Sequence, residues 1–143
     1  MATITINSKK FKRFMERYGA NLKRSIPKAL NRSGEKTREI ILMRTERGVG
    51  LRGAFKKYSP GYREYRNSQG RGTKPDLNFS GRMLSNLDVE RKSNNIIIVG
   101  FKRKEERVKA EQNQKTRPFI GVTSSEQSQV VKSFVRQLEK DLR

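Results

Sequence analysis

The sequence predicts an α+β fold in which a small antiparallel β-sheet is packed by a long N-terminal helix and a C-terminal helix. Apolar residues recur at steps of three and four over residues 8–46 and again over 124–143, the spacing of amphipathic helices. Between these regions, the β-branched run at 96–99 follows a Ser-Asn-Asn turn and is typical of a buried strand. We therefore expect a single domain over residues 1–143.

The N-terminal helical region, residues 8–46, follows a short alternating segment at residues 2–7 that predicts a strand. Ser8 is placed to cap the helix. Pro27 lacks an N–H and crowds the preceding turn, so the pattern predicts either one long kinked helix or two helices that meet at residues 25–27. The predicted apolar face consists of Phe11, Phe14, Met15, Tyr18, Leu22, Ile26, Leu30, Thr37, Ile40, Ile41 and Met43.

Residues 47–75 predict a long basic loop without regular structure, because glycines and prolines punctuate a stretch that has no apolar period. Tyr58, Tyr62 and Tyr65 alternate there with cations. Such cations attract phosphate, and tyrosines stack on bases or anchor protein interfaces. The alternative, tyrosines packed onto their own domain beneath solvated charges, stays open. The candidate contacts to nucleic acid or a partner are Arg52, Lys56, Lys57, Arg63, Arg66 and Arg71.

Residues 76–123 predict a short helix capped by Ser80, then a β-hairpin that pairs 87–92 with 95–101. Residues 102–115 are weakly patterned, with at most a helical turn near 105–110. An apolar segment at 116–122 then predicts a strand that begins at Pro118.

The last element, residues 124–143, predicts an amphipathic helix that begins at Ser124, with Gln127 completing a capping box. Its predicted apolar face consists of Val130, Val131, Phe134, Leu138 and Leu142.

Composition limits the possible functions. The chain has 34 Lys and Arg against 14 Asp and Glu, a net charge of +20, and this excess attracts phosphate or acidic protein surfaces. Cysteine and histidine are absent, which excludes disulfides, thiolate metal sites, the Ser-His triad and the usual zinc ligands. No apolar run is long enough to cross a bilayer, so we expect no membrane partner.

Catalysis finds little support in the sequence. A metal-dependent nuclease needs converging carboxylates, and residues such as Glu35, Glu39 and Glu46 would supply them only if folding brought them together. A tyrosine nucleophile for strand transfer would normally need a neighbouring histidine. The Gly-x-Gly-x-x-Gly match at residues 48–53 follows no predicted strand. We therefore predict no enzyme, no catalytic residue, no metal and no other cofactor.

Two short motifs resemble the tailed-phage virion morphogenesis families, which comprise neck, head–tail joining and tail completion proteins. In those families a leucine, a Ser/Thr-Gly pair and a hydrophobic pair precede a strand pair, as in residues 76–87. An Arg-Pro-Phe-aliphatic segment then precedes a final amphipathic helix, as in residues 117–122. The resemblance covers residues 10–142, although the Lys-, Glu- and Gln-rich segment before residue 117 replaces the Gly-containing turn of many relatives. The motif residues are Leu77, Ser80, Gly81, Leu84, Arg117, Pro118 and Phe119.

This resemblance implies a virion structural protein of the head–tail junction, either a neck or a tail completion (terminator) protein, made in the host cytoplasm. Its implied partners are other copies of itself in an oligomeric ring, typically a hexamer, then neighbouring portal, neck or tail proteins, and DNA in the channel. The first alternative is a non-specific nucleic-acid-binding protein for DNA packaging or condensation. The second is a DNA-processing enzyme.

Overall fold

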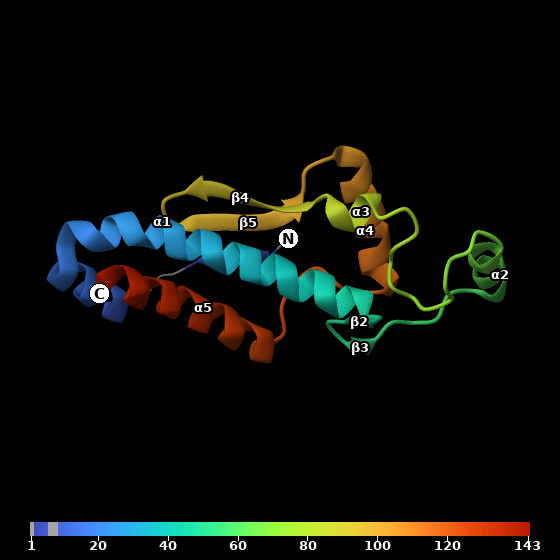
Figure 1. Ribbon diagram of the computed structural model, residues 1–143, viewed down its shortest axis with the longest axis horizontal. Coiled ribbons are helices and arrows are strands. Elements are labelled where there is room, and N and C mark those ends of the chain that lie inside the picture. Colours follow the sequence, from blue (N-terminus) through green and yellow to red (C-terminus); the bar gives the residue numbers. More distant parts are fainter. Residues whose placement is uncertain (1, 6–8) are drawn as a thin grey trace.

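The computed structural model describes residues 2–5 and 9–143 and confirms the α+β class. Strands β1 (Ala2–Thr5), β5 (Ile96–Phe101) and β4 (Leu87–Ser93) form an antiparallel sheet in that order. The predicted hairpin is confirmed, with Leu87 opposite Phe101. In Figure 1 this sheet lies on one side of helix α1 (Lys9–Glu46), and helix α5 (Ser124–Leu142) lies on the other. Helix α1 is thus the central element of the fold.

The break in α1 is at Gly19, not at the predicted residues 25–27. Gly19 has φ 56° and ψ −139°, which glycine adopts without a steric penalty, whereas Pro27 continues the helix. The segment before Gly19 folds back toward the C-terminal end of α5 (Figure 1). The predicted cap Ser8, the predicted strand end at 6–7 and the side chains of Phe11, Phe14, Met15 and Tyr18 lie outside the described residues.

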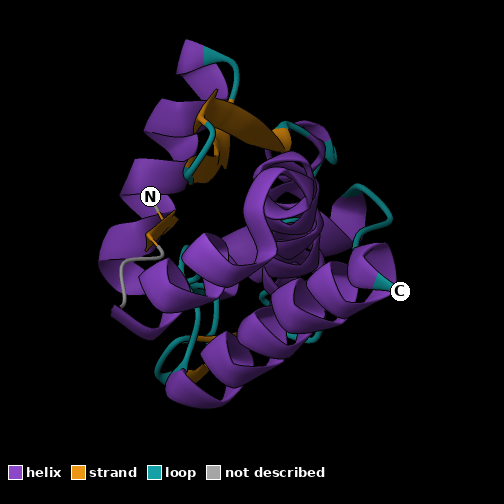
Figure 2. Ribbon diagram, turned by 90° about the vertical axis from the view of Figure 1, so that its left-hand side faces the viewer, coloured by secondary structure: helices purple, strands orange, loops and turns teal. Residues whose placement is uncertain are grey.

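Two apolar clusters pack against α1. Ile41 joins Val99, Phe101 and Phe119 beneath the sheet. Leu22, Ile26, Ala29 and Leu30 pack against Phe134 and Leu138 of α5. Two predicted core residues, Met43 and Val131, are instead 49% and 53% exposed. In the view of Figure 2, strand β1 and the C-terminal end of α5 lie on opposite sides of the molecule.

The prediction of a structureless loop over residues 47–75 is wrong. Strands β2 (Val49–Gly50) and β3 (Gly53–Ala54) pair as a small hairpin, and helix α2 spans Pro60–Ser68. Ser59 caps α2 by accepting a hydrogen bond from the Tyr62 N–H at 3.4 Å. We call residues 56–75 the arm, because α2 projects away from the helices and the sheet (Figure 1).

Three further predictions around the second motif need correction. A full helix, α4 (Lys104–Thr116), replaces the expected turn, although Glu106 and Ala110 are its only buried residues among those described. Residues 117–123 form no strand, since Pro118 lacks an N–H and the neighbouring carbonyls serve other donors. Thr123 and Glu126 form the capping box of α5, one residue before the predicted pair.

Candidate functional site

The structure places the predicted contact residues on the β2–β3 hairpin and the arm. Arg52, Lys56, Lys57 and Arg71 are exposed, and Arg63 is half-buried. Arg66, in contrast, is only 2% exposed, so its assignment as a contact residue is wrong.

Arg66 holds the two halves of the arm together. Its Nε donates to the Gly72 carbonyl at 2.7 Å, and its Nη2 donates to the Asp76 carboxylate at 3.2 Å and to the Asn78 carbonyl at 3.3 Å. A guanidinium can do this because its planar fork carries five donors, more than a lysine offers. Helix α2 is therefore fixed to the segment that returns to the body.

Tyr58 joins the arm to the body. Two guanidinium groups lie over its ring, with the Arg66 Cζ at 5.0 Å and the Arg117 Cζ at 4.7 Å from the ring centroid. Its Oη accepts a hydrogen bond from the Leu77 N–H at 3.0 Å. Burial raises the pKa of Tyr58 above its ordinary value, while the bond from Leu77 and the charge of Arg66 oppose that rise.

The two motifs meet at this ring. Arg117 donates through Nε to the Lys56 carbonyl at 2.7 Å and through Nη2 to the Lys57 carbonyl at 3.1 Å. Leu77 has φ 55°, a conformation that is unfavourable for a leucine and that the bond to Tyr58 and the burial of its side chain help to hold. We call Tyr58, Arg66, Leu77 and Arg117 the arm joint.

The rest of the first motif forms the short helix α3 (Arg82–Ser85). Gly81, not the predicted Ser80, is its N-cap, with φ 79°, while the Ser80 Oγ accepts from the Arg82 N–H at 3.4 Å. Leu84 is buried in the sheet-side cluster. Ser80 and Gly81 line a pocket of about 590 Å³ between the arm and α4, whose walls are partly polar and partly apolar. This pocket also contains Tyr58, Tyr62, Arg66, Lys109, Asn113 and Arg117.

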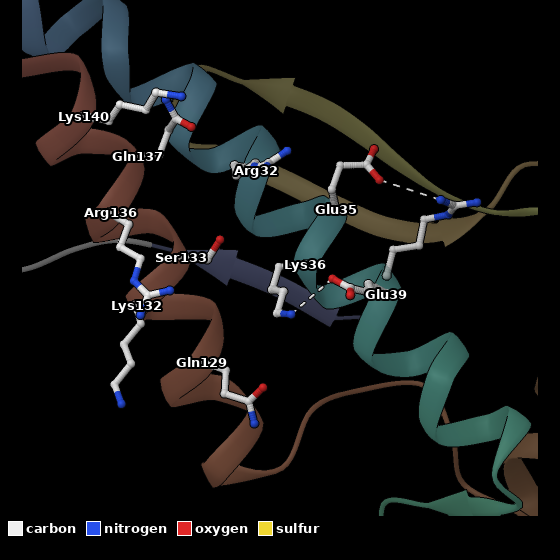
Figure 3. Close-up of a pocket in the computed structure, with 11 residues that line it drawn as sticks. Arg32, Glu35, Lys36, Glu39, Gln129, Lys132, Ser133, Arg136, Gln137 and Lys140 are labelled. Carbon is white, nitrogen blue, oxygen red and sulfur yellow. Dashed lines mark hydrogen bonds and ion pairs between the residues drawn. The ribbon is translucent and has the colours of Figure 1, made fainter.

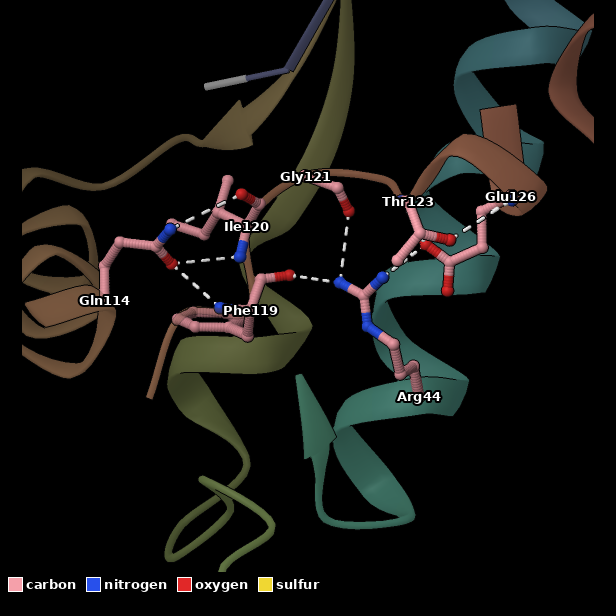
Figure 4. A network of polar contacts seen from close by, with 7 residues as sticks. All are labelled: Arg44, Gln114, Phe119, Ile120, Gly121, Thr123 and Glu126. Atoms are coloured by element: carbon pink, nitrogen blue, oxygen red, sulfur yellow. Dashed lines mark hydrogen bonds and ion pairs between the residues drawn. The ribbon is translucent and has the colours of Figure 1, made fainter. Parts of the chain in front are cut away.

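The rest of the second motif is held by Arg44 (Figure 4). The Arg44 Nη2 donates to the Phe119 carbonyl at 2.7 Å and to the Gly121 carbonyl at 3.1 Å, while Nη1 pairs with the Glu126 carboxylate. From the other side, the Gln114 Oε1 accepts from the Phe119 N–H at 2.9 Å. Phe119 is thereby fixed with no exposed surface.

Pro118 connects this segment to the small hairpin. Its carbonyl accepts a hydrogen bond from the Leu51 N–H at 2.8 Å. Gly50 approaches the same carbonyl so closely that an added Cβ would lie 2.3 Å from the oxygen. The β2–β3 hairpin is therefore packed directly on the second motif.

The carboxylates named as possible metal ligands do not converge. Glu35 pairs with Arg38 at 3.7 Å, and Glu39 pairs with Lys36 at 3.2 Å. Within residues 2–5 and 9–143, no group of three or more acidic, histidine or cysteine side chains is placed to hold a metal ion. Over the same ranges, no helix combines the length and the apolar character that crossing a membrane requires.

Sequence reasoning missed the roles of Arg44 and Gln114. The partners of Arg44 lie 75 to 82 residues away in the chain. Gln114 accepts from backbone N–H groups, which carry no sequence signal. No family model, curated protein or solved structure matches this chain. Function is therefore inferred from the described geometry and from the two motifs.

Proposed function

We propose that this protein is a phage virion structural protein of the head–tail junction, a neck or tail completion (terminator) subunit that forms an oligomeric ring, with a hexamer expected, around the DNA passage. The observation that carries the proposal is the arm joint, in which residues of both motifs hold a projecting arm to the body. Leu77 comes from the first motif and Arg117 from the second, and Tyr58 contacts both.

A projecting arm suits a ring because each subunit of a ring contacts its neighbours through two different surfaces. The arm presents Tyr62 and Tyr65, which are 37% and 51% exposed. Aromatic residues and arginines are the side chains that most often dominate the energy of protein interfaces. We propose that the arm of one subunit binds the body of the next, and that portal, neck or tail proteins bind the faces of the ring.

The second candidate is a non-specific nucleic-acid-binding protein for packaging or condensation, which the net charge of +20 favours. The two candidates differ in what the protein does without DNA. A ring subunit assembles alone or on purified heads or tails, whereas a condensation factor needs only the polyanion.

Light scattering after size-exclusion chromatography, at low and high salt, tests the proposal. The wild type is expected to form a ring, or to join heads or tails when mixed with them. Tyr65→Ala is expected to lose assembly while its circular dichroism stays unchanged. Val131→Ala is the matched control, because it removes a similarly exposed apolar side chain, 53% against 51%, from another helix.

Three outcomes would contradict the proposal. The wild type remains a monomer that never enters particles, or purified virions lack the protein. Alternatively, Tyr65→Ala assembles as the wild type does, which would remove the arm from the interface.

A further inference from the structure

A groove between α1 and α5 is lined by six Lys and Arg side chains and only two Glu side chains. Its volume is about 720 Å³, and Figure 3 shows side chains from both helices along it. We call it the α1–α5 groove. It is lined by Arg32, Glu35, Lys36, Arg38, Glu39, Gln129, Lys132, Ser133, Arg136, Gln137 and Lys140.

The acidic side chains of the groove are already neutralised by cations of α1. Glu35 pairs with Arg38 and Glu39 pairs with Lys36, as the dashed lines in Figure 3 show. Arg38 also donates through its Nε to the Leu87 carbonyl at 2.7 Å, so its side chain is already held by contacts within the fold.

Four other cations keep their charge available. Arg32 on α1 and Lys132, Arg136 and Lys140 on α5 form no ion pair with any residue in the described ranges. All four are exposed. Their positive potential is therefore directed into the groove and the solvent in front of it.

The three cations of α5 form a regular row. They are four residues apart, and each such step advances about 6 Å along a helix. One strand of duplex DNA carries a phosphate about every 3.4 Å of helix axis. The row spans about 12 Å, which is long enough to lie beside several phosphates of a duplex.

The lining also indicates which kind of polyanion fits. It contains neither an aromatic nor an aliphatic side chain. Single-stranded nucleic acid is usually held by bases stacked on aromatic rings, and protein partners by apolar or aromatic anchors. A row of cations and amides without such anchors suits the backbone of a duplex, whose contacts carry no sequence information.

We propose that the α1–α5 groove binds the phosphate backbone of duplex DNA without sequence preference. This inference rests on the proposed function for the presence of DNA, and it assigns the contact to the groove instead of the arm. The arm would then serve assembly and the groove would serve DNA retention.

The test compares two triple variants that remove the same charge. The groove variant carries Lys132→Gln, Arg136→Gln and Lys140→Gln, which leave the buried face of α5 intact. The control carries Arg103→Gln, Lys104→Gln and Lys115→Gln, exposed positions at the start of α4 and within it that belong neither to the arm nor to the groove. Fluorescence anisotropy measures binding of each protein to a short labelled duplex of arbitrary sequence, over a range of salt concentrations.

Each lost phosphate contact weakens binding about eightfold at about 0.1 M salt and lowers the salt slope by about 0.9. We expect the groove variant to lose about 100-fold or more in affinity and about 2.7 in slope. The control is expected to change affinity less than about threefold, since its cations lie outside the contact.

Four results would overturn the inference: equal losses in both variants, wild-type binding by the groove variant, tighter binding of a single strand than of the duplex, or equally good competition by poly-glutamate. Light scattering on the same proteins keeps the two proposals apart. If the wild type forms rings but the groove variant binds DNA as tightly as the wild type, the DNA inference fails and the ring proposal stands. If the wild type is a monomer but the groove variant loses DNA affinity, the ring proposal fails and the DNA inference stands.

Discussion

Replacing Gly50 with alanine is expected to separate the β2–β3 hairpin from the segment that precedes α5. The new Cβ would lie 2.3 Å from the Pro118 oxygen and 2.4 Å from the Phe55 Cε1, and real Cβ atoms essentially never come closer than 3.0 Å to such neighbours. The carbonyl must therefore move by more than about half an ångström. This movement stretches the 2.8 Å bond from the Leu51 N–H and shifts Phe119, which has no exposed surface.

Overpacking of this kind destabilises proteins by about 1–3 kcal/mol, and a lost hydrogen bond adds about 1 kcal/mol. We therefore expect Gly50→Ala to lower the free energy of unfolding by about 2–4 kcal/mol. Gly61→Ala is the control, because it lies in α2 with no atom within 4 Å of the added Cβ. The control should be neutral or more stable by up to about 1 kcal/mol.

Urea unfolding followed by circular dichroism, at one protein concentration, measures both variants. An unchanged m-value with a lower midpoint for Gly50→Ala would assign the effect to the folded state. Stability within about 0.5 kcal/mol of the wild type would refute the proposed packing of the hairpin on the second motif.

Three other outcomes follow from the same contacts. Tyr58→Phe leaves the buried Leu77 N–H without its acceptor and should cost about 1–3 kcal/mol in urea unfolding. The pKa of Tyr58 is raised in the folded state, so the unfolded chain releases this proton first as pH rises. The free energy of unfolding should therefore fall above pH 10. Unfolding measured across this range should show a smaller fall for Tyr58→Phe. Arg44→Met removes the Arg44 donor from the carboxylate of Glu126 and from the carbonyls of Phe119 and Gly121, and a loss of about 3–5 kcal/mol is expected in thermal unfolding. A loss below about 1 kcal/mol would contradict the anchoring role of Arg44.

The parts of the fold that the sequence predicts well are those whose signals are local. The β4–β5 hairpin combines a β-branched run with a turn, and both signals lie within about fifteen residues. The C-terminal helix has apolar residues at regular steps, so its extent was predicted well; its cap was misplaced by one residue, and Val131 is exposed instead of buried.

The break in α1 depends on distant contacts and was misplaced for that reason. Pro27 is the stronger local signal for a break. Leu22 and Leu30 nevertheless pack in one cluster with Phe134 and Leu138, more than a hundred residues away in the chain. A straight helix across Pro27 keeps this cluster together, and the chain reverses at Gly19 instead.

The arm was missed because its stability does not come from an apolar face. Helix α2 has conventional start signals in Ser59 and Pro60, but the only buried residue among its described positions is Arg66. Composition counts an arginine as surface charge. Only the structure shows that this one donates to a carboxylate and two carbonyls.

The same distinction changes the meaning of the net charge. Arg44, Arg66 and Arg117 direct their donors to carbonyl oxygens of their own chain, and the last two also stack on Tyr58. Their N–H donors are used to hold the motifs and the arm, a task for which a planar guanidinium is better suited than an ammonium group. A high arginine content is therefore partly architectural in this fold.

The cations that remain lie on different elements, and the two proposals assign them to different activities. Lys132, Arg136 and Lys140 line one side of the α1–α5 groove, while the arm carries exposed tyrosines beside its own cations. If DNA retention and assembly used the same surface, no set of substitutions would remove one and keep the other. The groove and the arm lie on different elements, so the groove variant should lose DNA binding and still form rings. General electrostatic attraction by a basic protein would not give this combination of results.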